Sequence, residues 1–278
     1  MNFLEMLPAQ IPTVVLDTET TGLTPGLGHR VVEIAALRLE NGREISRINT
    51  LLQPDRQMDP KASAINGISD DDLLGQPAFS EIAPALREML HGAVVVAHNA
   101  RFDAEFLGME FFISGQLTAP HDPLFATPWL CTLLLARRLF HFGQNHLTAI
   151  AHTLGIRTGA AHRAMNDVHM TAQIYRRMVA ELTRKNMRTI GDLLHAQGHT
   201  IRIPDPPPVT LPDAIAAARQ EGRDLRILYM GPTGETQRII TPLYPTHYQG
   251  EVYLIAYCHL RQAQRTFRLD RIFSASRV

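Results

Sequence analysis

Residues 13–22 read Thr-Val-Val-Leu-Asp-Thr-Glu-Thr-Thr-Gly, an apolar run that ends in acidic residues and a turn. The apolar run predicts a buried strand that leads directly into Asp17 and Glu19. Because side chains alternate along a strand, these two carboxylates point to the same side, where they repel each other unless a cation lies between them. Oxygen ligands of this kind favour hard cations such as Mg²⁺ or Mn²⁺. A solvated strand end is the alternative interpretation of the same two residues.

Two more acidic motifs follow at the ends of predicted elements. Asp103 lies in the first turn of a predicted helix that follows a short apolar strand, and a helix N-terminus by itself favours an acidic residue there. His162 and Asp167 are five residues apart, so on one regular helix they would lie about 140° apart. We therefore expect His162 in a loop and Asp167 near the start of the next helix; a surface histidine and a helix-terminal acid are the alternatives.

The apolar pattern divides the chain into strands and helices. Asn41-Gly42 predicts a hairpin turn between two early strands. Apolar periodicity predicts strands at residues 13–16, 31–39, 47–52 and 94–97, and helices at residues 79–90, 100–111, 127–139, 147–154 and 166–182. This order indicates an α/β fold.

The pattern changes after residue 183. A helix is predicted at residues 190–197, and the proline-rich stretch 204–208 can continue neither a helix nor a central strand. We predict a helix at residues 211–220 and strands at residues 225–230, 236–241, 251–258 and 265–269. The sequence thus predicts a domain at residues 10–182, a linker at residues 183–210 and a small β-rich domain at residues 211–278.

The composition of the 278-residue chain excludes several protein classes. No apolar run reaches the roughly 18 residues of a membrane span, and the first residues lack the pattern of a signal peptide, so we expect a cytoplasmic protein without a membrane partner. Cys131 and Cys258 are far apart, which predicts buried free thiols, and no Cys/His cluster has zinc-ligand spacing. Residues 1–182 hold 14 basic and 19 acidic residues, whereas residues 183–278 hold 13 and 8. The basic half could face a polyanion, unless the asymmetry is incidental.

The acidic motifs together resemble the DEDDh family of 3′–5′ exonucleases, over about residues 10–182. The matching residues are Asp17-Thr18-Glu19-Thr20-Thr21-Gly22, His98-Asn99-x-x-Phe102-Asp103 and His162-x4-Asp167. The resemblance implies a ribonuclease-H-like fold, a mixed sheet flanked by helices. It also implies that Asp17, Glu19, Asp103 and Asp167 hold two Mg²⁺ or Mn²⁺ ions, with His162 as the general base. Two such ions about 4 Å apart can activate water and stabilise the leaving oxygen, and a histidine pKa near neutrality suits proton transfer.

The same resemblance implies how the substrate is held. The predicted substrate-binding residues are Thr18, Thr20, Gly22, Ile68, His98, Asn99 and Phe102. Phe102 could stack on a base or belong to the core. Asn66 stands where the family often has histidine, and Cys131 stands where many relatives have aspartate. The implied reaction releases nucleoside 5′-monophosphates from single-stranded 3′ ends of DNA, with RNA as the alternative.

Residues 211–278 resemble a WYL domain. The strongest match is Phe267-Arg268-Leu269-Asp270-Arg271-Ile272, and the namesake tryptophan is replaced, because the triplet reads Val252-Tyr253-Leu254. The family implies a small, strongly bent β-barrel like those of SH3 and Sm proteins, with a role in ligand sensing or nucleic-acid binding. Arginines interleaved with tyrosines favour a nucleotide or single-stranded nucleic acid, whereas a solvated strand face is the alternative. The candidate ligand residues are Tyr229, Arg238, Tyr253, Arg268 and Arg271.

Two functional hypotheses follow. The first is an active exonuclease with an appended binding module; the second is a regulatory binding protein that uses the nuclease fold as a scaffold. The second would bind oligonucleotides tightly in Mn²⁺ without turnover. Residues 183–278 replace the short tail through which related proofreading subunits contact their polymerase, so attachment to a replicative polymerase is doubtful.

Overall fold

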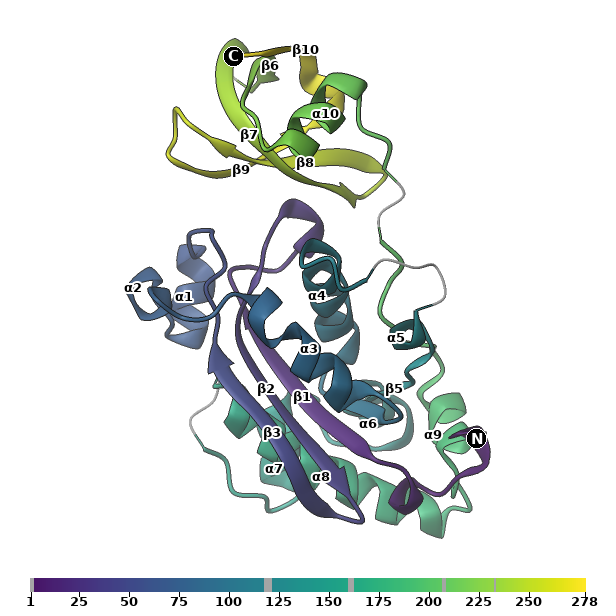
Figure 1. Ribbon diagram of the computed structural model, residues 1–278. Coiled ribbons are helices and arrows are strands. Elements are labelled where there is room, and N and C mark those ends of the chain that lie inside the picture. Colours follow the sequence, from purple (N-terminus) through teal and green to yellow (C-terminus); the bar gives the residue numbers. More distant parts are fainter. Residues whose placement is uncertain (1–2, 118–121, 160–162, 207–208, 233) are drawn as a thin grey trace.

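The computed structural model describes residues 3–117, 122–159, 163–206, 209–232 and 234–278, which form two units with one sheet each (Figure 1). In the first unit the strand order is β3-β2-β1-β4-β5. The central strand β1 pairs antiparallel with β2 and parallel with β4, so the sheet is mixed, as expected for a ribonuclease-H-like fold. The strands are β1 (Thr13–Thr20), β2 (Val31–Glu40), β3 (Arg43–Leu51), β4 (Val94–Ala97) and β5 (Trp129–Cys131).

Helices cover both faces of this sheet, because alternate residues of β1 and β4 are apolar on both sides. Val14 and Leu16 pack toward α3 (Phe79–Leu90) and α4 (Ala100–Ile113). Val15 packs toward the opposite layer, with Val94 and Val96. That layer contains α6 (Thr132–Leu139), α7 (Leu147–Thr153) and α8 (Ala164–Arg184).

Short helices complete the connections of the first unit. They are η1 (Phe3–Glu5), η2 (Pro8–Gln10), η3 (Pro25–Leu27), α1 (Pro60–Asn66), α2 (Asp70–Leu73) and α5 (Pro123–Ala126). The predicted hairpin turn is present, with positive φ at both Asn41 and Gly42. Among the described helices, none combines the length and the apolar character that crossing a bilayer requires.

The helix predicted over residues 127–139 is wrong in its first part. Residues 129–131 form strand β5, and the helix begins only at Thr132. Trp129, Leu130 and Cys131 are almost completely buried, and they pair in parallel with β4 at the edge of the sheet. Burial on two sides favours a strand over a one-sided helix, and a run of only three residues carries no clear period.

The segment predicted as a linker is largely packed on the first unit. Helix α9 (Ile190–Gln197) forms where it was predicted, and the side chain of Gln197 bonds to the backbone of β5 at Trp129 and Cys131. Beyond α9, Ile201 and Ile203 are buried in the core around α3 and α4. These long-range contacts fix the described chain up to residue 203 on the first unit. The linker expected over residues 183–210 stays a prediction.

The second unit contains helix α10 packed on a five-stranded antiparallel sheet of order β10-β6-β7-β8-β9. Its elements are α10 (Asp213–Glu221), β6 (Leu225–Gly231), β7 (Gly234–Tyr248), β8 (Glu251–Cys258), β9 (Ala263–Arg268), η4 (Leu269–Arg271) and β10 (Ile272–Arg277). The long strand β7 bends strongly, with a register shift between Pro242 and Tyr244. The expected barrel is not seen as a closed sheet, because β9 and β10 are the two edges of the described ladder. Cys131 and Cys258 are both buried free thiols, as predicted.

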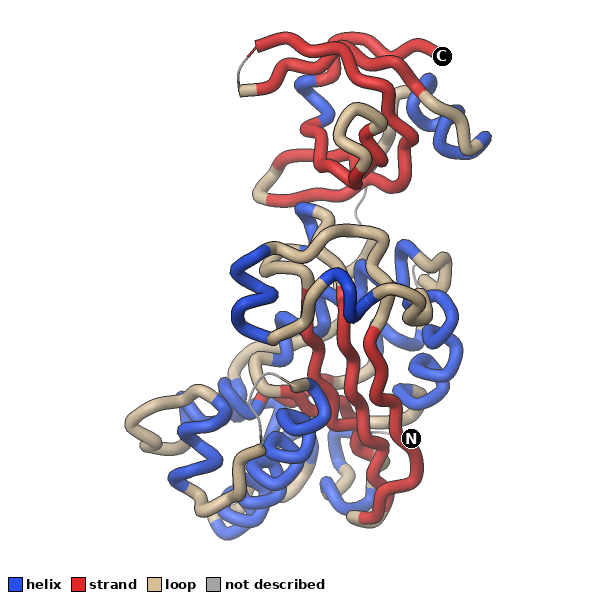
Figure 2. The backbone as a smooth tube through the Cα atoms, turned by 90° about the vertical axis from the view of Figure 1, so that its left-hand side faces the viewer, coloured by secondary structure: helices blue, strands red, loops and turns tan. Residues whose placement is uncertain are grey.

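The second unit contacts the loop between β1 and β2, which Figure 2 shows beneath the second group of strands. The hydroxyl of Thr246 donates to the carbonyl of Gly26 at 2.6 Å, and the hydroxyl of Thr266 donates to that of Leu27 at 2.8 Å. A Cβ at Gly26 would lie 2.6 Å from the carbonyl oxygen of His247, so the two backbones touch directly. The loop that follows the acidic end of β1 is therefore held by the second unit.

Candidate active site

The acidic end of β1 carries two carboxylates on the face that looks toward α8. Asp17 and Glu19 continue the alternation of Val15, whose side chain packs in the α8 layer. Asp167 lies in the first turn of α8 and meets them there. One carboxylate oxygen from each of the three residues lies within 4.8 Å of the others. Asp17, Glu19 and Asp167 thus form one acidic cluster, although Asp17 and Asp167 are 150 positions apart in the sequence.

The fourth carboxylate approaches from the other face of the sheet. Asp103 lies in the first turn of α4 and is almost completely buried. Its Oδ1 accepts hydrogen bonds from the backbone N–H of Thr18 at 3.1 Å and from the Thr18 hydroxyl at 2.8 Å. Thr18 points away from Asp17 and Glu19 on the strand, so it is the residue that can fix the α4 carboxylate.

The cluster makes negative charge costly. Burial raises the pKa of Asp17 well above its ordinary value, and the neighbouring carboxylates Asp103, Asp167 and Glu19 raise it further. Burial, followed by the charge of Asp167, raises the pKa of Glu19 to about 7. Burial also raises the pKa of Asp103 to about 7, although the hydrogen bonds from Thr18 act in the opposite direction. A hard divalent cation would relieve this repulsion, and an all-oxygen donor set fits such an ion.

A fifth carboxylate, Glu33 of β2, stands directly opposite Glu19 in the ladder and is buried. It accepts hydrogen bonds from the Arg163 guanidinium at 3.2 Å and from the backbone N–H of Ala164 at 3.2 Å. Glu33 therefore holds the start of α8, the helix that carries Asp167. Glu33 was not among the predicted site residues, although a single acid within the apolar run of residues 31–37 was the available signal.

A cavity of about 710 Å³ opens beside the cluster. Asp17, Glu19, Asp103 and Asp167 all line it. Four of the predicted substrate residues also line it: Thr18, His98, Asn99 and Phe102. Residues not predicted complete the wall, namely Leu23, Leu133, Arg137, Gly143, Gln144, Asn145, His146 and Leu147. No local pattern marked them, because they come from the β1–β2 loop, from α6, from the loop between α6 and α7, and from the start of α7.

The other predicted residues lie in different places. Thr20 bonds to the carbonyl of Gly22 and is buried behind the cavity. Gly22 leaves room for an imidazole, because a Cβ there would lie 2.4 Å from the His29 ring. Ile68 packs in a small separate core with Val32. His162 lies outside the described residues.

His98 ties the cavity wall together. Its Nε2 lies 3.1 Å from the carbonyl oxygen of Asn145, and its Nδ1 lies 2.9 Å from the Thr132 hydroxyl. Because a carbonyl only accepts, Nε2 carries the proton. Burial lowers the pKa of His98 to about 4, so the ring is neutral near pH 7. His98 therefore positions the loop that contains Asn145, and it is not a proton acceptor poised near neutrality.

Two parts of the chain match known protein families. Residues 14–175 match the family model described as exonuclease, and residues 211–277 match that of the WYL domain. The DNA polymerase III subunit epsilon of Treponema pallidum is 34% identical over 189 residues, which cover 67% of this chain and 83% of that protein. This chain belongs to the exonuclease family.

Other relatives agree with this assignment. The epsilon subunit of Escherichia coli is 33% identical over 66% of this chain and 78% of its own length. An epsilon-like protein of Rhodobacter capsulatus is 37% identical, but the match spans only 25% of that protein. Among solved structures, exonuclease X in complex with 5′ overhanging duplex DNA superposes with a TM-score of 0.51 at 26% identity, over 67% of this chain and 99% of that one. Escherichia coli exonuclease I in complex with a dT13 oligonucleotide has the same fold over 88% of this chain and 55% of its own, with a TM-score of 0.57 at 18% identity.

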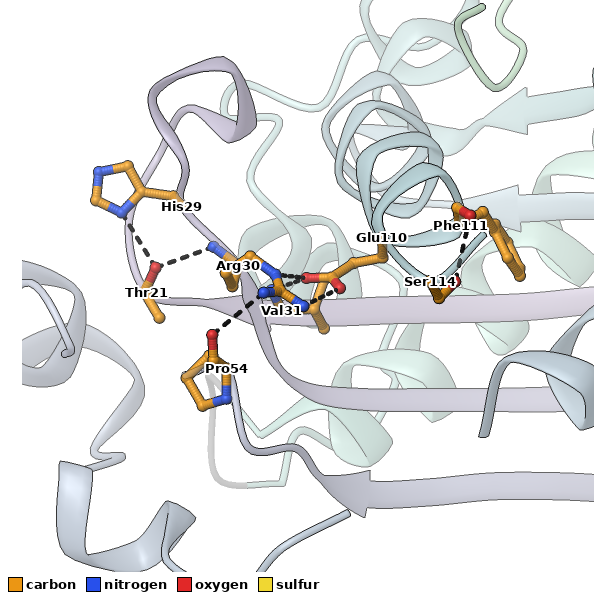
Figure 3. Close-up of polar contacts among 8 residues, drawn as sticks. All are labelled: Thr21, His29, Arg30, Val31, Pro54, Glu110, Phe111 and Ser114. Atoms are coloured by element: carbon orange, nitrogen blue, oxygen red, sulfur yellow. Dashed lines mark hydrogen bonds and ion pairs between the residues drawn. The ribbon is translucent and has the colours of Figure 1, made fainter. Parts of the chain in front are cut away.

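A buried ion pair joins two elements that border the candidate site. Figure 3 shows the guanidinium of Arg30, just before β2, paired side by side with the carboxylate of Glu110 on α4; both nitrogen–oxygen distances are 2.8 Å. Burial opposes the charge of Arg30, but Glu110 outweighs this effect and raises the pKa of Arg30. Glu110 also accepts from the backbone N–H of Val31. The pair joins the β1–β2 loop to the helix that carries Asp103.

Three of the five candidate ligand residues of the WYL domain lie together. Tyr253 of β8 and Arg268 of β9 are direct partners in the ladder, and the Tyr229 hydroxyl lies 3.4 Å from the Arg268 backbone nitrogen. Arg268 pairs with Glu251 at 2.9 Å and with Asp270 at 2.6 Å. Arg271 follows in η4, whereas Arg238 stands on β7 opposite Ile227, two strands from β9. Acidic neighbours already compensate Arg268, so an anionic ligand would have to replace them.

Proposed function

We propose that the protein is a metal-dependent exonuclease that removes nucleotides from the 3′ ends of single-stranded DNA and releases nucleoside 5′-monophosphates. The observation that carries this proposal is the convergence of Asp17, Glu19 and Asp167 within 4.8 Å at the floor of an open cavity. The relatives named as DNA polymerase III epsilon subunits, and exonuclease X in complex with DNA, support DNA as the substrate.

Asp17, Glu19, Asp103 and Asp167 would hold two Mg²⁺ or Mn²⁺ ions. When bound, such ions supply a nucleophilic water at neutral pH and stabilise the leaving oxygen. The chain's own part is to fix the carboxylates, and Thr18 does this for Asp103 through two hydrogen bonds. His162 is proposed as the group that takes the proton from the attacking water, because an imidazole titrates near the working pH.

The wall of the cavity would position the terminal nucleotide. Phe102 is half-buried and packs against Phe106, with ring centroids 4.7 Å apart, so one ring face is held rigid for stacking. Leu23 is 80% exposed and lines the cavity, so its side chain is free to contact a base or sugar. Asn66 is buried, donates to the carbonyl of Thr20 at 3.4 Å and lowers the pKa of Glu19, a structural use of the position where relatives often have histidine.

The WYL domain would add a binding function. Its bent strand β7 supports the SH3/Sm-like barrel that was expected, and the juxtaposed Tyr229, Tyr253 and Arg268 are proposed to bind a nucleotide or nucleic-acid ligand. Because α9, α10 and strands β6 to β10 take up most of the described chain after residue 190, a free tail for a polymerase contact is not part of this proposal.

The test is a digestion of 5′-labelled single-stranded DNA in Mg²⁺ or Mn²⁺. We expect a ladder that shortens from the 3′ end, nucleoside 5′-monophosphates as products, and no cleavage of circular single strands. A matched RNA oligonucleotide decides between the two nucleic acids. Asp167→Asn should lower the rate by more than about 100-fold, because it removes a ligand of the ion.

Asp213→Asn is the matched control, because Asp213 is likewise an acid in the first turn of a helix, but in α10 of the second unit. It should leave the rate unchanged. Activity that survives both a chelator and Asp167→Asn would contradict the proposal. Tight oligonucleotide binding without turnover in Mn²⁺ would favour a regulatory binding protein instead.

A further inference from the structure

A second groove of about 570 Å³ continues from the carboxylate cavity. The two hollows share Asn99, Leu133 and Arg137 as common wall residues. The far side of the groove is formed by residues 199–205, which lie between the two family matches and belong to neither. Figure 1 shows this part of the chain, in green, rising from α9 along the side of the first unit.

Residues 199–205 form a built wall. Ile201 and Ile203 are buried, whereas Arg202 between them is exposed, which is the alternation of an extended segment. Pro204 lies against α4 at Gly108, where a Cβ would come within 2.8 Å of the proline ring. Gln197, fully buried, donates to the carbonyl of His199 at 2.8 Å. The segment is therefore fixed on both sides of the residues that it presents to the groove.

The groove is lined by cationic side chains that could bind phosphate groups. Arg101, Arg137 and Arg202 line it together with His199, and the carboxylates Glu105 and Asp205 belong to the same lining. Within the described part of the chain the guanidinium of Arg137 has no hydrogen-bond or ion-pair partner. Arg202 pairs with Asp205 only at 3.8 Å, with both side chains more than half exposed. Arg101 pairs with Glu105 while 82% exposed. Exposed pairs of this kind contribute little, so the arginines can exchange a carboxylate for a phosphodiester at small cost.

Another hollow, which shares different wall residues with the carboxylate cavity, has a different charge character. It shares Gly143, Gln144 and His146 with that cavity, and its described lining contains histidines but no arginine or lysine. A polyanion would therefore leave the cavity on the arginine side.

We infer that residues 199–205, with Arg137, form a binding groove for the phosphodiester backbone of the strand 5′ to the terminal nucleotide. The inference rests on the proposed exonuclease function, and it assigns to the inter-domain segment the task of holding the body of the substrate. Arg137 lies at the junction and contacts the phosphate nearest the cleaved bond, whereas Arg202 contacts a phosphate further along the strand.

The experiment compares a substrate that occupies only the carboxylate cavity with one that also extends into the groove. The p-nitrophenyl ester of thymidine 5′-monophosphate fills the carboxylate cavity alone, and a 12-nucleotide single-stranded DNA also fills the groove. Arg202→Gln should lower kcat/KM on the oligonucleotide about fivefold, as expected for one exposed charge contact, and leave kcat/KM on the ester unchanged. The slope of log affinity against log salt should fall by about 0.7, the value for one phosphate contact on a single strand. Arg137→Gln should lower activity on both substrates.

Arg177→Gln is the matched control, because it removes an exposed arginine from α8 outside both hollows. An unchanged oligonucleotide affinity and salt slope in Arg202→Gln would overturn the inference, as would an equal loss in Arg177→Gln. Affinity is also measured by fluorescence anisotropy with labelled oligonucleotide in Ca²⁺, so the groove is tested even if turnover fails. Wild-type protein that cleaves neither substrate would refute the proposed function separately.

Discussion

Glu19→Gln should stabilise the metal-free protein while it abolishes catalysis. Burial and the charge of Asp167 raise the pKa of Glu19 from 4.5 to about 7 in the folded chain. The folded state thus binds this proton more tightly than the unfolded state does. The contribution of protonated Glu19 to the free energy of unfolding is fully present below about pH 4.5. It is lost as the pH rises from there through about 7. Glutamine does not ionise, so the free energy of unfolding of the variant does not fall over this pH range.

The size of the effect follows from the width of the shift. At about 1.4 kcal/mol per pH unit, a shift from 4.5 to about 7 corresponds to about 3 kcal/mol at pH 8. For a domain of this size that raises Tm by roughly 6–12 °C. At pH 4 Glu19 is protonated in both states, and the variant should gain nothing. Loss of one ligand should also reduce the rise in Tm that Mn²⁺ gives to the wild type.

The assay is thermal unfolding followed by circular dichroism in EDTA at pH 4, 6 and 8, repeated with Mn²⁺. The quantity compared is the difference in Tm between variant and wild type at each pH. Glu181→Gln is the control, because Glu181 is 41% exposed on α8 and pairs only with neighbours one turn away. A Tm difference that does not grow between pH 4 and pH 8 would refute the view that buried repulsion dominates this cluster.

Three further changes test the supports of the site. Thr18→Val removes the hydroxyl that donates to Asp103, so the pKa of Asp103 should rise. The acidic limb of the pH–rate profile should therefore shift to higher pH. Glu110→Gln breaks a buried ion pair with Arg30 and should lower the free energy of unfolding in urea by about 3–5 kcal/mol. Gly26→Ala places a Cβ against the second unit and should increase cleavage between the two units in limited proteolysis.

Each of these changes has a matched control. Thr236→Val removes a hydroxyl that bonds to Tyr229 in the second unit, and the pH–rate profile should stay in place. Glu44→Gln breaks an exposed pair and should cost less than about 1 kcal/mol. Gly231→Ala meets only an ordinary 3.6 Å contact and should leave the proteolysis pattern as in the wild type. A control that matches its partner variant would contradict the structural reason given for that variant.

Local chemistry alone determined much of this protein. Buried strands and helices with a clear period form at the predicted places, for example at residues 79–90, 94–97 and 190–197. They were predictable because the spacing of apolar residues along a short segment indicates which face of an element is buried. The acidic motif of β1 was readable for the same reason: alternation puts Asp17 and Glu19 on one side of a strand.

Tertiary structure decided what depends on contacts between distant residues. Only packing of α8 against β1 brings Asp167 to Glu19, and only the sheet register sets Glu33 opposite Glu19. Strand β5 was mistaken for helix because three residues carry no period, and their pairing partner lies more than 30 positions away. The burial of Ile201 and Ile203 could not be predicted either, because it depends on a core formed by distant segments. Sequence fixes what each residue can bind, whereas the cooperative burial of remote segments fixes which residues meet.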